Sequence, residues 1–324
     1  MAVLVTGAAG FIGYHVCTAL LGRGESVIGV DNFNDYYDVS LKEARLAELT
    51  GQANFTSLRI DIADRGALAE AGPGIDRVVH LAAQAGVRHS LTHPFDYQRA
   101  NLEGHLSVLE FCRGLENCTH LVYASSSSVY GGNKKLPFSE ADPVDHPVSL
   151  YAATKKAGEL MSHSYSHLYR LPATGLRFFT VYGPWGRPDM AAWLFVRAIL
   201  AGEPIPVFNN GHMRRDFTYI EDIVAGVLGV LDHPPEDVAA GAAPHRVFNI
   251  GNNRSEDLMR FIGLIEDALG KKAEIDYRPM QDGDVVETYA DIDAIKSLTG
   301  YSPVTSIEEG IPKFVAWYRD FKGV

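Results

Sequence analysis

Cysteine is scarce in this chain of 324 residues, which contains only Cys17, Cys112 and Cys118. Three cysteines without a Cys-x-x-Cys pair exclude a disulfide framework and a zinc knuckle, and they favour buried, reduced thiols. No apolar run approaches the roughly 18 residues that a membrane-spanning helix requires. No charged and apolar leader precedes the strand pattern that starts at residue 2. We therefore expect a cytoplasmic protein without a membrane partner.

Basic residues are outnumbered, because 29 Lys and Arg stand against 40 Asp and Glu, for a net charge of −11 at pH 7. This surplus disfavours nucleic acid as a partner, although a local arginine cluster can still bind a small phosphate. A metal site is also not expected. His163 and His167 have the spacing of zinc ligands on a helix, but no Glu follows His163 and no third ligand is evident.

The N-terminal region has the pattern of a dinucleotide site. A buried-strand pattern over 2–6 leads into glycines at positions 7, 10 and 13 and then into an apolar helical stretch. Such glycines let the backbone approach a pyrophosphate at the helix N-terminus. A second strand ends in Asp31, where a carboxylate binds the adenosine ribose and repels a 2′-phosphate. We predict NAD as the cofactor; the alternative is that Asp31 only caps the next loop.

Strand and helix patterns alternate up to about residue 180, which is typical of an α/β fold with a doubly wound parallel sheet. Ligands bind at the carboxyl ends of such strands, where Asp61 and the serines at 125–128 lie. Asp61 either accepts from the adenine amino group or caps the following helix, and the sequence does not separate the two. The strands are expected near 2–6, 26–31, 54–60, 77–82, 119–125 and 173–178.

Tyr151 and Lys155 are four residues apart at the start of a helical stretch. On one helix this spacing places both side chains on the same face. A nearby ammonium favours the phenolate of a tyrosine, whose ordinary pKa is about 10. Together with the glycine turn, the pair indicates redox chemistry on a hydroxyl group.

These motifs resemble an extended short-chain dehydrogenase/reductase with a Rossmann domain, in the branch of nucleotide-sugar epimerases and dehydratases. The segments that carry this resemblance are Thr6–Gly13, Leu81–Gln84, Ser125–Gly131 and Tyr151–Lys155. Within the branch, the chain is most similar to the UDP-glucuronate 4-epimerases, in the segments Asp31–Asp38, Ala83–Ser90, Gly183–Asp189 and Met213–Tyr219.

The resemblance implies Tyr151 as the general base and Lys155 as the residue that lowers its pKa and holds the nicotinamide ribose. A hydroxyl residue assists, and Ser126 and Ser128 stay equal candidates for this role. The resemblance and the sheet pattern together assign NAD contacts to Gly7, Gly10, Phe11, Ile12, Gly13, Asp31, Asn32, Asp61, Ile62, Leu81, Ala82, Ala83, Gln84, Asn101, Tyr151, Lys155 and Phe178.

The related dehydratases carry an Asp-Glu pair after the hydroxyl residue, whereas this chain has Ser127 and Ser128. Without a second carboxylate a 4-keto sugar has no partner for elimination, so we expect the hydride to return. The resemblance thus implies an epimerase that interconverts UDP-glucuronate and UDP-galacturonate. The alternatives are a UDP-hexose or UDP-N-acetylhexosamine 4-epimerase and a catalytically silent NAD-sensing module of the same fold.

On the substrate side, the resemblance implies that Arg187 grips the uronate carboxylate beside Thr180; without it, Arg187 reads as a surface residue. Arg88 is a second candidate for the same negative group. Val207 and Phe208 are expected against uracil, and Arg215 at the pyrophosphate. Asp284 is expected at the ribose, with a turn residue as the alternative, while Gln281 stands where relatives often have an arginine.

We expect two interleaved domains. Residues 1–179 and 217–251 are predicted to bind NAD, and residues 180–216 and 252–324 to form a smaller α/β domain for the nucleotide sugar. A helix and a strand over 217–231 and 247–251 are expected to return to the cofactor sheet, joined by a surface loop at 234–244. The resemblance also implies a homodimer, through the helix after Tyr151 and the helix near 97–112.

Overall fold

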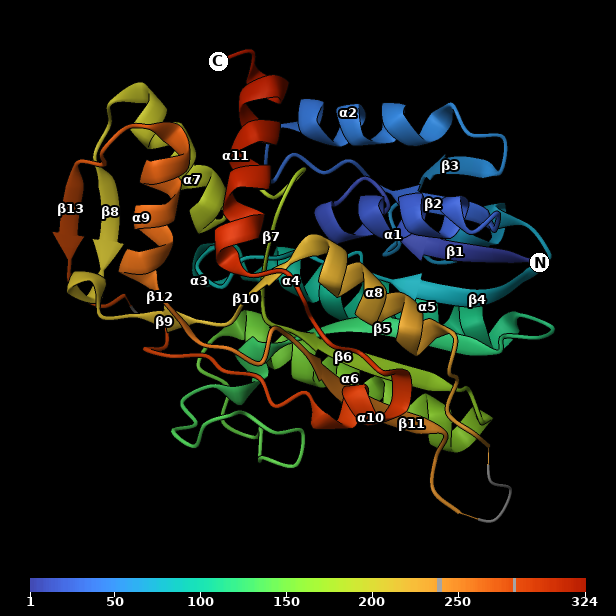
Figure 1. The fold of residues 1–324 in the computed structure, drawn as a ribbon. Coiled ribbons are helices and arrows are strands. Elements are labelled where there is room, and N and C mark those ends of the chain that lie inside the picture. Colours follow the sequence, from blue (N-terminus) through green and yellow to red (C-terminus); the bar gives the residue numbers. More distant parts are fainter. Residues whose placement is uncertain (238–240, 282–283) are drawn as a thin grey trace.

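The computed structural model describes residues 1–237, 241–281 and 284–324. Its centre is a parallel sheet in the strand order β11-β6-β5-β4-β1-β2-β3 (Figure 1). The fold prediction is confirmed, and each of the six expected strands lies within two residues of its expected ends. The strands are β1 (Ala2–Thr6), β2 (Ser26–Asp31), β3 (Phe55–Arg59), β4 (Ile75–His80), β5 (His120–Ser126), β6 (Ala173–Phe178) and β11 (His245–Ile250).

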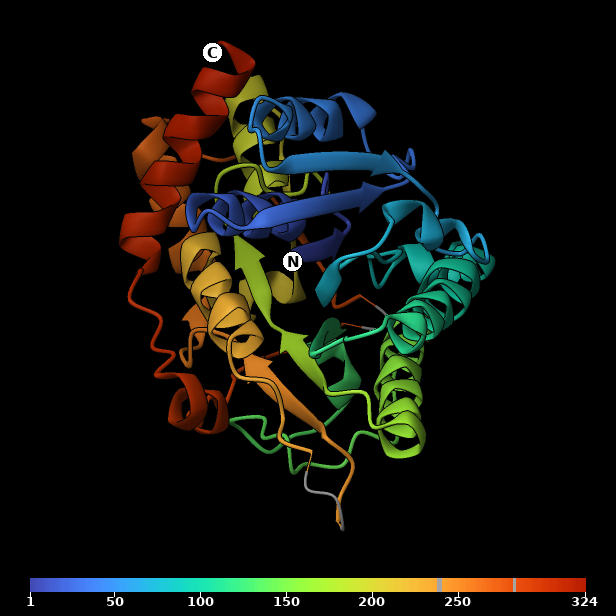
Figure 2. The ribbon, with the colours of Figure 1, turned by 90° about the vertical axis from the view of Figure 1, so that its right-hand side faces the viewer.

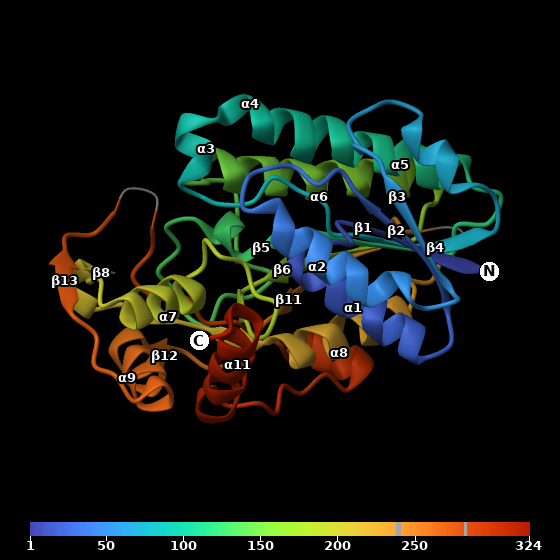
Figure 3. The ribbon, with the colours of Figure 1, turned by 90° about the horizontal axis from the view of Figure 1, so that it is seen from above.

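Helices cover both faces of this sheet, as the view from above shows (Figure 3). One face is covered by α1 (Phe11–Gly22) and α8 (Ile220–Leu231), with α2 (Val39–Thr50) beside α1. The other face is covered by α5 (Gly104–Gly114) and α6 (Leu150–Tyr169). Each layer buries its own apolar cluster against the strands, because successive strand residues point to opposite faces. Short helices α3 (His89–Thr92) and α4 (Pro94–Tyr97) precede α5.

A smaller part of the chain lies beyond the carboxyl ends of the strands (Figures 1 and 2). There β7 pairs with β10, β8 with β13 and β9 with β12. The elements of this part are β7 (Thr180–Tyr182), α7 (Ala191–Ala201), β8 (Ile205–Phe208), β9 (Arg214–Arg215), β10 (Phe217–Tyr219), β12 (Glu256–Asp257), α9 (Leu258–Leu269), β13 (Ile275–Arg278) and α11 (Ile307–Lys322). The helix α10 (Asp293–Thr299) packs instead on α8 and β11 of the main sheet (Figure 1).

The return to the sheet differs in detail from the prediction. The stretch expected as one helix starts with three strand residues, β10, and the helix α8 follows from Ile220. Thr218, in the middle of β10, is fully buried and pairs with Val181, so tertiary packing overrides the helical pattern there. Part of the loop expected at 234–244, residues 238–240, lies outside the described residues.

Cys17 and Cys112 are buried free thiols, as expected, whereas Cys118 is partly exposed. In the described ranges, no helix combines the length and apolar character needed to cross a membrane. Those ranges also contain no group of three or more His, Cys, Asp or Glu side chains that is placed to hold a metal ion.

Candidate active site

A cavity of about 830 Å³ lies at the carboxyl ends of β1, β2, β4, β5 and β6 and extends to the smaller part of the chain. Of the residues predicted for the site, all but Asn101 and Val207 line it. The cavity therefore brings together side chains from the first and last thirds of the sequence, as expected for the crevice of a doubly wound sheet.

The glycine turn at one end of the cavity has no room for side chains. Gly7 has a φ of +73°, and a Cβ added to Gly13 would lie 2.0 Å from the Gly7 carbonyl oxygen. Gly10 caps α1 without a side-chain acceptor, so the first N–H groups of the helix have no partner from a cap. Bare backbone and a free helix N-terminus fit a dinucleotide pyrophosphate.

Asp31 lies next to this turn and is nearly buried. Its carboxylate accepts hydrogen bonds from the backbone N–H groups of Ala9, at 3.1 Å, and Phe33, at 2.9 Å. The carboxylate therefore caps the following turn and also lines the cavity, so the two alternatives for Asp31 coexist. Lys42, on α2, lies 3.8 Å from it and was not predicted.

Two predicted cofactor residues are engaged with the protein itself. Asp61 accepts from the Ala63 N–H at 2.9 Å and pairs with Arg99 at 3.1 Å, so it caps a local turn while facing the cavity. Asn101 lies behind the wall, where its amide holds both backbone groups of Gln84. Asn101 is buried in the π-helical turn Gln98–Glu103 and does not line the cavity, so the structure shows it as a support for Gln84, and its contact with the cofactor stays a prediction.

The second wall carries the predicted catalytic pair. Ser149 caps α6 by accepting from the Ala152 N–H at 3.1 Å, which fixes the helix start just before Tyr151. Lys155 donates to the Ala124 carbonyl oxygen at 3.0 Å, and its Nζ lies 6.0 Å from the centre of the Tyr151 ring. Tyr151 and Lys155 thus lie on one face of α6 against the end of β5.

Burial raises the pKa of Tyr151, while hydrogen bonding with Ser126 and the positive charge of Arg187 lower it. Burial also lowers the pKa of Lys155 to about 8. The chain alone therefore does not give the lowered tyrosine pKa that the sequence suggested, because desolvation disfavours both charged forms. Of the two candidate serines, Ser126 is the one whose hydrogen bonding lowers the pKa of Tyr151, and the Ser126 hydroxyl donates to the Ser128 hydroxyl at 3.2 Å.

The predicted uronate arginine, Arg187, lines the cavity close enough to influence Tyr151. Its Nε and Nη2 donate to the two carboxylate oxygens of Asp189, at 3.0 and 2.5 Å. The Tyr36 hydroxyl donates to the same carboxylate at 3.0 Å. Burial alone would raise the pKa of Asp189, but the charge and hydrogen bonds of Arg187 lower it overall. Arg187 is thus a paired cation inside the cavity.

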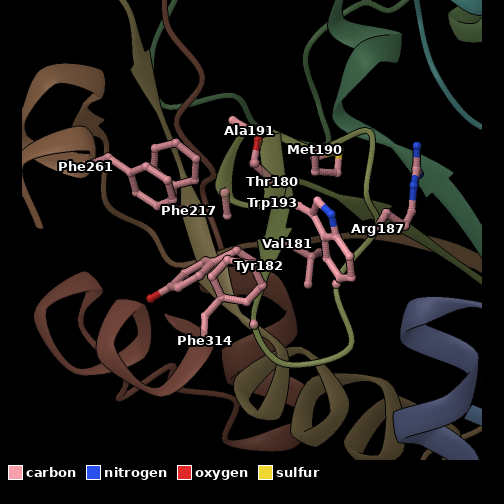
Figure 4. Close-up of a pocket in the computed structure, with 13 residues that line it drawn as sticks. Thr180, Val181, Tyr182, Arg187, Met190, Ala191, Trp193, Phe217, Phe261 and Phe314 are labelled. Carbon is pink, nitrogen blue, oxygen red and sulfur yellow. The ribbon is translucent and has the colours of Figure 1, made fainter. Parts of the chain in front are cut away.

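Thr180 and Arg187 also border a second, much smaller cavity (Figure 4). Phe217, Phe261 and Phe314 gather at its other side, and the rings of Phe217 and Phe261 stack with centroids 4.0 Å apart. The Arg187 side chain extends away from these rings (Figure 4). The apolar packing therefore supports the start of the 183–190 segment while the guanidinium faces the main cavity.

The far end of the cavity combines an aromatic ring with cationic groups. Phe208 lines it, and the Arg88 guanidinium lies 4.9 Å from the centre of that ring. Arg215 donates to Asp284 at 2.6 Å, and Arg88 lies 3.8 Å from the same carboxylate. These groups suit a nucleotide base and a diphosphate. Of the predicted 281–284 loop, residues 282 and 283 lie outside the described residues.

The structure places Val207 differently from the prediction. Its side chain is fully buried in the core, while its neighbours Pro206 and Phe208 line the cavity. Successive residues of β8 point to opposite sides, so Val207 and Phe208 cannot both present side chains to one ligand.

Arg45 is the most unexpected residue near the cavity, since this guanidinium on α2 is fully buried. It donates to the carbonyl oxygens of Ala9, at 2.9 Å, of Trp185, at 2.6 Å, and of Gly186, at 3.2 Å. The glycine turn and the segment that carries Arg187 are therefore joined through one side chain. This contact could not be predicted from the sequence, because an arginine on a helix is usually exposed to solvent.

Comparisons with known proteins agree with this geometry. Residues 3–251 match the model of the NAD dependent epimerase/dehydratase family. The chain is 47% identical to a probable UDP-glucuronate 4-epimerase of Rhizobium meliloti, over 98% of this chain and 97% of that one. It is 48% identical to UDP-glucuronate 4-epimerase 1 of Arabidopsis thaliana, over 100% of this chain and 78% of that one.

Among solved structures, the chain is similar to a UDP-glucuronic acid 4-epimerase from Bacillus cereus in complex with UDP-glucuronic acid and NAD. The TM-score is 0.90 and the identity 34%, over 99% of this chain and 100% of that one. The similarity therefore extends over both the sheet and the smaller part of the chain.

Proposed function

Because the chain belongs to the NAD dependent epimerase/dehydratase family, we propose that it is an NAD-dependent UDP-glucuronate 4-epimerase. It interconverts UDP-glucuronate and UDP-galacturonate. One observation carries the uronate assignment: a guanidinium, that of Arg187, lines the same cavity as the Tyr151 phenol and is close enough to lower its pKa. A planar guanidinium fork is suited to a carboxylate next to the reacting carbon.

In this proposal NAD is held by the glycine turn, by Asp31 and Asn32 at the adenosine ribose, and by Lys155 at the nicotinamide ribose. Asp61, Ile62 and the segment 81–84 line the adenine and ribose side. When bound, NAD supplies a hydride acceptor that oxidises C4 of the sugar and later gives the hydride back. The oxidised nicotinamide also brings positive charge, which favours the Tyr151 phenolate.

Tyr151 accepts the proton of the C4 hydroxyl as C4 is oxidised, and Ser126 orients that hydroxyl together with the phenol. Ser128 holds Ser126 through the hydrogen bond at 3.2 Å. After the 4-keto sugar has turned, Tyr151 returns the proton to the new C4 hydroxyl. NADH does not accumulate, because the returned hydride restores oxidised NAD in each cycle.

The 4-keto uronate is a β-keto acid, which loses CO2 readily, so its carboxylate must be held. Arg187 and Thr180 are proposed to hold it, with Arg88 as a second cation. Ser127 and Ser128 stand where the related dehydratases have acidic residues, so the site offers no carboxylate at that position for elimination. Phe208 is proposed to contact uracil, Arg215 the pyrophosphate and Asp284 the ribose.

The division into an NAD-binding part, 1–179 and 217–251, and a nucleotide-sugar part, 180–216 and 252–324, belongs to the same proposal. The homodimer also remains a proposal, supported by apolar side chains that are exposed on α5 and α6, Leu106, Leu160 and Leu168. A cytoplasmic location remains a prediction from the sequence.

The test is to incubate the purified protein with UDP-glucuronate in D2O and to follow the sugar protons by NMR. UDP-galacturonate without deuterium at C5 and without UDP-pentose is the expected product. Deuterium at C5 or a pentose product would contradict the proposal. The Arg187–Asp189 pair gives a specific reason to test UDP-glucose and UDP-N-acetylglucosamine as well, since a neutralised arginine also suits a neutral sugar.

A further inference from the structure

The Arg187 guanidinium already has a resident anion. Asp189 accepts from its Nε and Nη2, so one edge of the fork is occupied without substrate. In the described part of the chain, Asp189 is the ion-pair partner of Arg187, the Tyr36 hydroxyl lies close to the same guanidinium, and Arg187 itself lines the cavity. A guanidinium carries five N–H donors on separate edges. A substrate carboxylate on the open edge can therefore share Arg187 with Asp189 instead of replacing it.

Asp189 is itself fixed from the cofactor side of the cavity. The Tyr36 hydroxyl, from the segment between β2 and α2, donates to Asp189 Oδ2 at 3.0 Å. Burial, with the charge of Asp189, raises the pKa of Tyr36 to about 12, so the phenol keeps the proton that it donates. The Tyr36 ring packs on His89 with centroids 4.9 Å apart, and a Cβ on Gly86 would lie 2.4 Å from its hydroxyl. The Asp189 carboxylate is thus held from two sides.

Epimerisation makes a demand on Arg187 that a simple binding site does not. The 4-keto sugar must present its opposite face to the same hydride, so its C6 carboxylate has to move relative to Arg187. The Arg187 side chain is only 24% exposed, and a partly buried cation that loses its counterion is destabilised. If the substrate carboxylate were the only counterion of Arg187, rotation of the 4-keto sugar would therefore be unfavourable.

We propose that Asp189, held by Tyr36, is a positioning residue that serves as the permanent counterion of Arg187 and keeps it compensated while the substrate carboxylate moves. This inference rests on the proposed function. Asp189 offsets part of the positive charge of Arg187 that attracts the uronate carboxylate. It therefore weakens substrate binding but favours turnover. An interaction that stabilises the bound substrate and the transition state equally lowers KM but does not raise kcat.

The experiment compares NAD-loaded wild type, Asp189→Asn and the matched control Asp35→Asn, an exposed carboxylate in the segment that carries Tyr36. With UDP-glucuronate, Asp189→Asn is expected to lower kcat by about tenfold or more with an equal or lower KM. The Kd of UDP-glucose is expected to stay unchanged. A higher KM with retained kcat would overturn the inference, and so would equal weakening of both ligands, which indicates a folding role.

Tyr36→Phe is the second variant, which keeps both charges and removes only the hydroxyl that holds Asp189. It is expected to lower kcat for UDP-glucuronate by about threefold without raising KM, and a raised KM with unchanged kcat would contradict the inference. Tyr36→Phe still tests the inference if the Asp189→Asn variant does not fold. If wild type fails to convert UDP-glucuronate, the proposed function itself is wrong. If wild type converts it and both variants match wild type, only the counterion role is wrong.

Discussion

Burial disfavours the charged forms of both Tyr151 and Lys155. Burial raises the pKa of Tyr151 and lowers that of Lys155 to about 8. The Lys155 ammonium bonds the Ala124 carbonyl and not the phenol. In the proposed mechanism, the positive charge that favours the Tyr151 phenolate would therefore come from Arg187 and from bound NAD. Loading with NAD would then also prepare Tyr151 for catalysis.

The lowered pKa of Lys155 makes stability depend on pH in a defined window. The folded protein loses this proton near pH 8, whereas the unfolded chain keeps it to about 10.4. Between these values the unfolded state binds more protons, so the free energy of unfolding rises with pH. For the NAD-free protein, the difference between wild type and Lys155→Met is expected to shift in favour of wild type by about 3 kcal/mol at most from pH 8 to 10. Urea denaturation at both values measures it, and a pH-independent difference would contradict the burial of a titrating lysine.

The two serines after β5 are expected to differ in their importance. Hydrogen bonding with Ser126 lowers the pKa of the Tyr151 phenol, whereas the Ser128 hydroxyl hydrogen-bonds Ser126. Ser126→Ala is therefore expected to reduce kcat by about 100-fold and Ser128→Ala by less than about tenfold. Steady-state kinetics with UDP-glucuronate, at equal NAD content, compares the two. Equal losses would mean that the pair works as one unit.

The glycine turn before α1 shows what a local pattern can predict. The spacing of Gly7, Gly10 and Gly13 indicated a bare backbone, and the contact distances give the reason. The pattern does not predict which face of a neighbouring strand or helix each side chain lies on. Val207 points into the core because β8 alternates, and Asn101 is buried within a π-helical turn. Sequence periodicity does not fix such one-residue shifts.

Two glycines of α1 provide a matched test. A Cβ on Gly13 would lie 2.0 Å from the Gly7 carbonyl oxygen, whereas a Cβ on Gly22 would meet nothing within 4 Å. Gly13→Ala is expected to lower the free energy of unfolding by more than about 3 kcal/mol and to abolish copurified NAD. Gly22→Ala is expected to raise it by about 0.5 kcal/mol and to keep NAD. Denaturant melts and the absorbance of released cofactor report both effects, and normal NAD content in Gly13→Ala would contradict the close-approach argument.

The strands and most cavity residues follow from sequence because each motif is local, while the links between distant segments do not. Arg45 joins the glycine turn to the segment of residues 185–186, about 140 positions later. Asp189 is only two residues from Arg187, yet an Arg-Pro-Asp triplet does not reveal that its ends pair. Such contacts depend on how the two parts of the chain close around the cavity, and no single window of sequence contains that information.

The predicted homodimer gives a test that involves the outer face of the molecule. Phe95, Leu160 and Leu168 are 81%, 59% and 62% exposed, and Leu160 and Leu168 lie on one face of α6. Exposed apolar side chains that form a contiguous patch mark association surfaces, and these three belong to neighbouring elements. The double variant Leu160→Glu, Leu168→Glu is expected to be a monomer by light scattering. The control Val304→Glu, at another exposed apolar position, is expected to leave the dimer intact. Because the glycine turn, Asp31 and Lys155 of one chain already line a cavity of about 830 Å³, the monomer is expected to keep its NAD. A wild type that is already monomeric at micromolar concentration would refute the dimer, and loss of NAD on dissociation would mean that the cavity depends on the second copy.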